Sequence, residues 1–333
     1  MFSQSFFDRI PTKRGKAFYA IACGERLTKL EIKERAGLSM STVISAVDSL
    51  CESGLVTVGE RRVSGGGKPH SVIDVSADRC VYGVSYKAGK LFGVAMDLRG
   101  EILARRTMTP SVGVSAGVAV GTFLSRLAEG APSPLAIGLA LTCDEREQIV
   151  RRLTEEAGTD VLPLTNTQAI AYHALWQGGA CPLAAIGIGN RVKCAVLGER
   201  DCRLIDLSEL TLAPVFSEGK GIGALLSAAQ VERVLFDRSY GGHYSYAGGD
   251  LLECRDLSDY SALLIRAIAG VAESVRALVA PREILLFGDY ITRGFFDRIR
   301  DACPEQTLSR EESNGEIFAR GAAEAALAEK VFS

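Results

Sequence analysis

This sequence has no paired cysteines, no long apolar run and no excess of charge of one sign. The nine cysteines stand singly, without a CxxC pair or a Cys/His cluster, which favours reduced, mostly buried thiols over a zinc centre or a disulfide scaffold. No apolar run approaches the roughly 18 residues of a membrane span. Residues 1–16 lack the basic-then-apolar order of a signal peptide. We therefore expect a cytoplasmic protein without a membrane partner.

The charges nearly cancel, with 38 Lys and Arg against 40 Asp and Glu, but they are unevenly distributed. Residues 1–75 contain 11 basic and 8 acidic residues, which leaves 27 basic and 32 acidic residues for the remainder. A small basic module ahead of an acidic body fits a DNA-binding head on a regulatory body. The 333 residues, 47% of them hydrophobic, are enough for two or three domains with buried cores.

The first part of the chain predicts three helices. Residues 14–23 form an amphipathic pattern, and Thr28 with Glu31 makes a capping box at the start of a second helix. Gly37 supplies the turn conformation for a tight helix crossing, and Ser39 caps a third helix. That third helix has one apolar stripe, formed by Val43, Ala46, Val47 and Leu50.

Two alternating segments, 55–63 and 69–75, follow these helices and predict a hairpin with a glycine-rich tip. Three helices and a hairpin in this order are typical of a winged helix-turn-helix, whose third helix enters the major groove. The candidate DNA-binding residues at the start of that helix are Ser39, Met40, Ser41, Thr42 and Ser45. The candidates on the wing are Arg61, Arg62, Lys68 and His70. The alternative is a module of this kind that only contacts proteins or dimerises.

After residue 77 the pattern alternates between strands and helices. Residues 79–108 predict three consecutive strands, and residues 183–205 open a second, similar group in which Cys194 and Cys202 could face one another. A meander with helices, repeated twice, indicates a duplicated α/β body with a cleft between its halves. Further helices are expected at 113–129, 145–158, 166–176, 221–238, 257–280 and the C-terminus, with strands at 134–142 and 282–289.

Three segments share motifs with one known family. They are SGGGKP at 64–69, GVSYKAGKLFGVAMDLRGEIL at 83–103 with its DLxGE turn, and GAA at Gly321–Ala323. In these motifs the chain resembles the ROK family of sugar-responsive repressors and sugar kinases. The resemblance implies an α/β protein with an N-terminal winged helix-turn-helix, followed by a duplicated actin-like ATPase (ribonuclease H-like) body.

With this resemblance we divide the chain into three domains. Residues 1–77 form the DNA-binding domain, residues 78–182 with 312–333 the first actin-like subdomain, and residues 183–311 the second.

The chain departs from the kinase pattern in its first phosphate segment and at its sugar site. Kinase members have an Asp, two glycines and a Thr where this sequence has Ser85, Lys87, Ala88 and Gly89. Their Asn-Asp pair becomes Asn166-Thr167, and a Thr hydroxyl is too weakly basic to activate a sugar hydroxyl.

The second phosphate loop and the zinc segment also differ. Arg191 and Lys193 replace glycines of the second phosphate loop. The family's zinc segment has no counterpart. We therefore expect no enzymatic activity, no catalytic residue, no cofactor and no bound metal.

We predict a transcriptional regulator, a repressor of carbohydrate-related genes, that binds a double-stranded DNA operator as a homodimer or higher homo-oligomer. The candidate effector cleft for a sugar or an anion consists of Lys87, Lys90, Asn166, Thr167, Arg191 and Lys193. The competing interpretation of its cations is that they turn into solvent. The alternative functions are a sugar or phosphosugar kinase of the ROK family and a purely structural protein.

Overall fold

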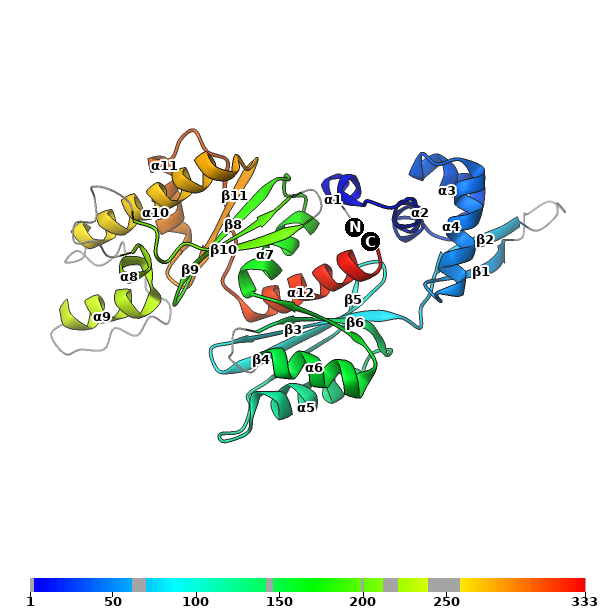
Figure 1. Ribbon diagram of the computed structural model, residues 1–333, viewed down its shortest axis with the longest axis horizontal. Helices are drawn as coiled ribbons and strands as arrows, with labels where there is room; N and C mark the ends of the chain where they lie inside the picture. Colours follow the sequence, from blue (N-terminus) through cyan, green and yellow to red (C-terminus); the bar gives the residue numbers. More distant parts are fainter. Residues whose placement is uncertain are drawn as a thin grey trace. The chain divides into compact units, whose positions relative to one another are not determined.

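The computed structural model describes residues 3–61, 70–141, 146–198, 201–211, 221–238 and 258–332. The chain divides into two compact units (Figure 1). Unit 1 comprises Met1–Gly178 and Asn314–Ser333, and unit 2 comprises Gly179–Ser313. Within the described residues, no helix is both long and apolar enough to span a bilayer.

Unit 1 begins with an N-terminal module of four helices and one hairpin. The helices are α1 (Gln4–Arg9), α2 (Lys13–Ala22), α3 (Lys29–Ala36) and α4 (Met40–Glu52). Each starts at a hydroxyl residue whose side chain accepts a backbone N–H, and Thr28 with Glu31 forms the predicted capping box. Gly37 ends α3 in the left-handed conformation, with φ 64°. The capping box and the conformation of Gly37 were predicted correctly from the sequence, whereas the short helix α1 was not predicted.

The hairpin consists of β1 (Val56–Arg61) and β2 (His70–Val75), which pair antiparallel from Val56 opposite Val75 to Arg61 opposite His70. Leu27 adds a bridge to Ile73 beside it. The predicted stripe of α4 is buried, together with Phe18, Ile21, Ile32, Leu27 and Ile73. The apolar faces of the helices and the hairpin therefore share one core.

The rest of unit 1 is a five-stranded mixed sheet covered by helices on both faces (Figure 1). Its strands, in spatial order, are β5 (Ile102–Met108), β4 (Lys90–Asp97), β3 (Cys80–Lys87), β6 (Pro134–Ala140) and β7 (Asp160–Leu164). One face packs against α5 (Ala116–Ala128) and α6 (Arg146–Ala157), and the other against α7 (Asn166–Trp176) and α12 (Gly315–Lys330).

Helix α12 lies directly on this sheet because glycines leave room for its backbone. A Cβ atom at Gly83 would lie 1.9 Å from the carbonyl oxygen of Ala319, and one at Gly138 would lie 1.9 Å from that of Ala322. A Cβ atom at Gly321 would lie 2.0 Å from the carbonyl oxygen of Ala169 in α7. The small residues of the GAA motif thus allow close packing on both sides of α12.

Replacing Gly138 by alanine should therefore lower the free energy of unfolding by about 3 kcal/mol, because backbone atoms must move to admit the methyl group. Urea titration would measure the loss. Gly117→Ala is the matched control, since its Cβ atom would lie 3.6 Å from the nearest atom, Nη1 of Arg152, at ordinary contact distance. In α5 this control should be neutral or slightly stabilising. Equal effects of the two variants would contradict the packing argument.

Unit 2 repeats the same plan. Its strands, in spatial order, are β10 (Cys202–Asp206), β9 (Val192–Leu197), β8 (Leu183–Ile188), β11 (Glu283–Gly288) and β12 (Leu308–Arg310). Its helices are α8 (Gly223–Leu226), α9 (Ala228–Arg238), α10 (Ser258–Val279) and α11 (Arg293–Ala302). In both units three antiparallel strands are followed by two parallel ones. The duplicated mixed α/β body predicted from the sequence is therefore present.

The structure corrects several details of the sequence-based assignment. Helix α5 begins at Ala116 rather than at residue 113, because Ser115 caps it. The helix expected over 221–238 is divided at Ser227. Cys194 and Cys202 do not face one another, since Cys194 pairs with Ile205 and Cys202 with Leu197. The short elements β7, α11 and β12 were not predicted.

Candidate nucleic-acid interface and effector positions

The start of α4 presents hydroxyl groups to solvent. Ser39 caps the helix: its Oγ accepts the Thr42 N–H at 3.2 Å and lies 3.0 Å and 2.8 Å from the hydroxyls of Ser41 and Thr42. Ser39, Ser41 and Ser45 are exposed, whereas Thr42 is half-buried. The hydroxyls of Ser39, Ser41 and Thr42 already have partners within the chain, so Ser45 is the better donor for an external ligand.

Two apolar side chains stand among these serines. Met40 is 37% exposed and Ile44, one helical turn later, is 41% exposed, so both lie on the outer face of α4. Ile44 was not among the DNA-contacting residues predicted from the sequence. Its signal was the i, i+4 spacing from Met40, which places it off the buried stripe. Apolar groups at such a position can contact thymine methyl groups in the major groove.

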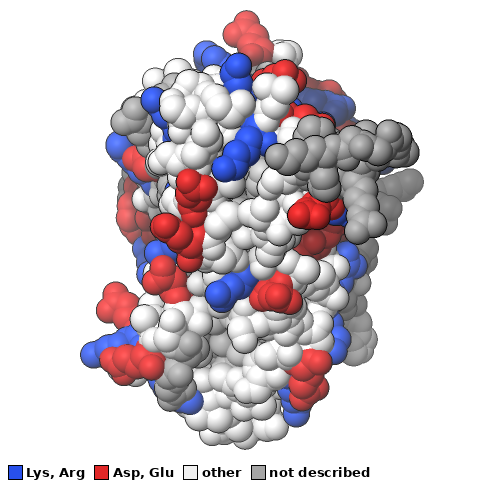
Figure 2. Space-filling view, turned by 90° about the vertical axis from the view of Figure 1, so that its right-hand side faces the viewer, with Lys and Arg blue, Asp and Glu red and all other residues white. Residues whose placement is uncertain are grey.

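Helix α4 itself contains no Lys or Arg. The basic side chains that contact it or its C-terminal end come from α2 and α3. Lys29 of α3 pairs with Asp48 of α4, with 3.8 Å between Nζ and Oδ1. Arg14 of α2 donates to the Ser53 hydroxyl at 3.0 Å. Figure 2 shows acidic and basic side chains interspersed on the side where α3, α4 and the hairpin lie in Figure 1. The described part of this face is thus of mixed charge.

The wing candidates lie at the far end of the hairpin. Arg61 ends β1 and His70 begins β2, directly opposite in register. Arg62 and Lys68 lie outside the described residues, as does the motif SGGGKP.

The first group of effector candidates surrounds the β3–β4 turn in unit 1, where Lys87 pairs with Lys90 in register. The Lys87 ammonium lies 5.6 Å from the centre of the Phe318 ring in α12, and Lys90 is exposed. Ser85, which was predicted from the sequence to replace the Asp of the kinase pattern, is fully buried and donates its hydroxyl to the Gly315 carbonyl at 2.6 Å. A carboxylate there would face this carbonyl oxygen, and two acceptors repel one another.

Asn166 and Thr167 are the first two residues of α7. They lie between Thr165 and Gln168, which form a capping box. Thr167 is buried, and Asn166 is half-buried. The Asn166 Oδ1 atom is buried and has no hydrogen-bond partner among the described residues. It is therefore the more available acceptor of the pair.

The second group, Arg191 and Lys193, belongs to unit 2 and is balanced by a carboxylate. Arg191 Nε lies 3.0 Å from Asp206 Oδ2, and Lys193 is opposite Asp206 in register. Partial burial tends to raise the pKa of Asp206, but hydrogen bonds from Ser208 and the two cations hold that pKa below its ordinary value. Since the six effector candidates are divided between separately described units, their convergence on one cleft stays a prediction.

Two further features of unit 1 were not foreseen. An apolar hollow of about 270 Å³ lies between the β3–β4 hairpin, the loop before α5 and the end of β6. A buried cluster joins α7 to α12, where Glu324 Oε2 lies 2.9 Å from His173 Nδ1 and Oε1 lies 3.0 Å from Arg320 Nε. Burial raises the pKa of Glu324, and both partners oppose that shift. Among the described residues, no group of three His, Cys, Asp or Glu is placed to hold a metal ion.

Neither a protein-family model nor a curated protein sequence matches this chain. Among solved structures, a ROK family transcriptional regulator described as a homolog of the E. coli MLC protein matches with a TM-score of 0.71 and 14% identity, over 98% of both chains. A ROK hexokinase from Thermus thermophilus matches with a TM-score of 0.59 and 19% identity, over 74% of this chain and 98% of its own.

A ROK family glucokinase from Streptomyces griseus, solved with glucose and AMPPNP, matches with a TM-score of 0.54 and 16% identity, over 74% of this chain and 99% of its own. At such identities the likeness is one of fold. These structural neighbours of the chain are therefore ROK family members, a transcriptional regulator and sugar kinases, and the chain has their mixed α/β fold.

Proposed function

We propose that this chain is a DNA-binding transcriptional regulator of the ROK type, whose N-terminal module is a winged helix-turn-helix. The observation that supports it most is the face of α4. Its start presents Ser41, Ser45, Met40 and Ile44 to solvent, while its opposite stripe is buried against α2 and α3. A capped helix with a mixed polar and apolar outer face suits insertion into the major groove.

The extent of the structural matches also supports a regulator. The regulator's match extends over 98% of this chain, whereas the hexokinase and the glucokinase match 74% of it with almost their whole lengths. About a quarter of this chain thus has no equivalent in those kinases. The predicted DNA-binding domain, residues 1–77, is a segment of this size.

The body serves in this proposal as a dimerisation and effector module that lacks kinase activity, and the regulator represses carbohydrate-related genes. Buried Ser85 and Thr167 occupy the positions that are carboxylates in the kinase pattern, so neither phosphate positioning nor base catalysis has its usual group. Phosphorylation of a hexose or an N-acetylhexosamine that is lost in Thr167→Val would instead establish the kinase alternative.

Genome-wide footprinting of the tagged protein tests the proposal, followed by gel-shift titration of the recovered sites. We expect discrete sites and a salt-dependent affinity. Binding no tighter than to random DNA would contradict a regulator that recognises specific sequences. Sedimentation of the same sample measures its oligomeric state and so tests the proposed dimer.

The contribution of the outer face of α4 to DNA affinity can be measured with a single substitution. Ile44→Ala should weaken binding to the preferred site by about 5- to 10-fold, because one apolar base contact is lost, and should leave random DNA unaffected. Val118→Ala is the matched control, since Val118 is similarly exposed on α5. An equal loss on both DNAs would argue against direct recognition by Ile44.

A further inference from the structure

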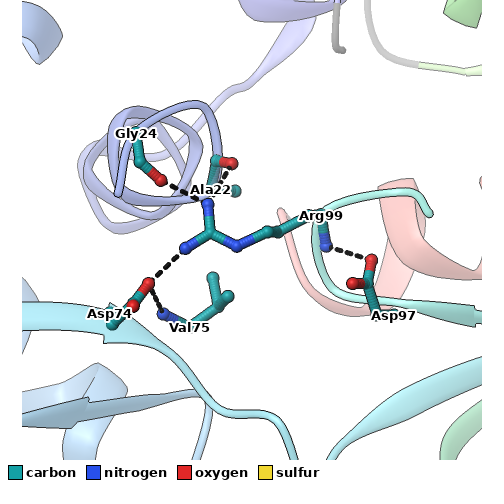
Figure 3. A network of polar contacts seen from close by, with 6 residues as sticks. All are labelled: Ala22, Gly24, Asp74, Val75, Asp97 and Arg99. Carbon is teal, nitrogen blue, oxygen red and sulfur yellow. Dashed lines mark hydrogen bonds and ion pairs between the residues drawn. The ribbon is translucent and has the colours of Figure 1, made fainter. Parts of the chain in front are cut away.

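A single arginine of the body contacts two elements of the N-terminal module. Arg99 belongs to the turn between β4 and β5, and its guanidinium donates to the carbonyl oxygens of Ala22, at 2.9 Å, and Gly24 (Figure 3). It also pairs with the carboxylate of Asp74 in β2. Ala22 is the last residue of α2, and Gly24 lies two residues beyond it, after the C-cap Cys23. We call these three contacts the Arg99 junction.

The turn that holds Arg99 is itself fixed. The carboxylate of Asp97 accepts the backbone N–H groups of Arg99 and Glu101, both at 2.8 Å. Gly100 has φ 87°, and a Cβ atom there would lie 3.1 Å from the Trp176 ring. The side chain of Arg99 therefore extends from a turn whose backbone is held in place, which keeps the guanidinium close to its three acceptors.

The chemistry of the junction requires arginine. Carbonyl groups at the end of a helix have no partner within that helix, and a cation there is favoured by the helix dipole. A planar guanidinium can donate to two carbonyls and a carboxylate at once, whereas a lysine ammonium is a point charge on a flexible stem. The side chains of Arg99 and Asp74 are 23% and 35% exposed, so the ion pair itself should add little to overall stability.

We propose that Arg99 is a positioning residue, which restrains the orientation of the DNA-binding module on the rest of unit 1. This inference depends on the proposed function. In a dimer, two modules held in fixed orientations match two half-sites at one spacing, and less freedom is lost on binding. The same turn ends β4, the strand that begins at Lys90 of the candidate effector hairpin. The Arg99 junction is thus a place where the body contacts both the end of α2 and the β1–β2 hairpin of the N-terminal module.

The test compares Arg99→Ala and Arg99→Lys in the full chain with Arg105→Ala. Arg105 is a matched control, because it lies in the adjoining strand β5 and pairs with Glu316 of α12, 3.2 Å away. The first measurement is hydrogen exchange without DNA. Arg99→Ala should speed exchange of amides in residues 22–26 and 72–75 relative to wild type, and Arg105→Ala should not.

The second measurement is affinity for a complete operator and for one isolated half-site. Arg99→Ala should weaken operator binding by about 10-fold and change half-site binding by less than about 2-fold, because the DNA-contacting surface stays intact while its orientation is less restrained. Arg99→Lys should restore less than half of that loss on a logarithmic scale. Equal losses on both DNAs would show a merely structural role and overturn the proposal.

Exchange unchanged in Arg99→Ala would also overturn it. A wild-type protein that bound no specific DNA would instead contradict the proposed function. In that case the exchange measurement would still decide whether Arg99 restrains the module, since it needs no DNA.

Discussion

Ser41→Glu should reduce operator affinity by about 100-fold without lowering stability. Ser41 is exposed in the first turn of α4, which contains no acidic residue. A carboxylate near a helix N-terminus is favoured by the helix dipole, so the free energy of unfolding should stay the same or rise slightly. The same charge would face DNA phosphates at the groove, and like charges brought together cost several kcal/mol. Opposite effects on stability and binding distinguish this result from unfolding.

Gel shift at two salt concentrations and thermal denaturation measure both quantities. Ser125→Glu is the matched control, because Ser125 is an exposed serine on α5, outside the N-terminal module. The control adds the same charge and should change affinity by less than about 2-fold. If both variants bind equally well, α4 does not face DNA, and the interaction-module alternative for residues 1–77 is favoured.

Phe332→Ala should lower the free energy of unfolding by about 3–5 kcal/mol, the largest loss of stability that we expect. Phe332 is 1% exposed, and its ring lies 5.0 Å from Phe6 and 5.2 Å from Phe18 between ring centres. The backbone approaches just as closely, since a Cβ atom at Gly15 would lie 2.0 Å from the Phe332 carbonyl oxygen. The C-terminal end of the chain thus completes the core of the first helices.

Chemical denaturation of Phe332→Ala, Phe332→Leu and Val112→Ala tests this packing. Phe332→Leu keeps much of the volume and should lose less stability than alanine. Val112 is fully exposed, so its replacement should change the free energy of unfolding by less than about 0.5 kcal/mol. A loss below 1 kcal/mol in Phe332→Ala would show that the aromatic cluster adds little.

The sequence by itself determined the features that depend on neighbours a few residues away. The capping box of Thr28 and Glu31, the left-handed Gly37, the Ser39 cap and the buried stripe of α4 all follow from side chains within one or two helical turns. The meander of β3, β4 and β5 was equally readable, because short turns join consecutive strands. These local rules were sufficient for the main elements and for the duplicated body, but not for the short elements α1, β7, α11 and β12.

Only the tertiary structure decided which distant groups meet. Ser85 donates to Gly315, 230 residues away in the chain, and Arg99 contacts Ala22 and Gly24 across more than 70 residues. Periodicity shows which face of an element is buried but not its partner, so the Arg99 junction and the place of Phe332 could not be predicted. Periodicity does not determine the register between strands either. Cys194 pairs with Ile205 rather than with Cys202, because the turn between β9 and β10 sets the alignment.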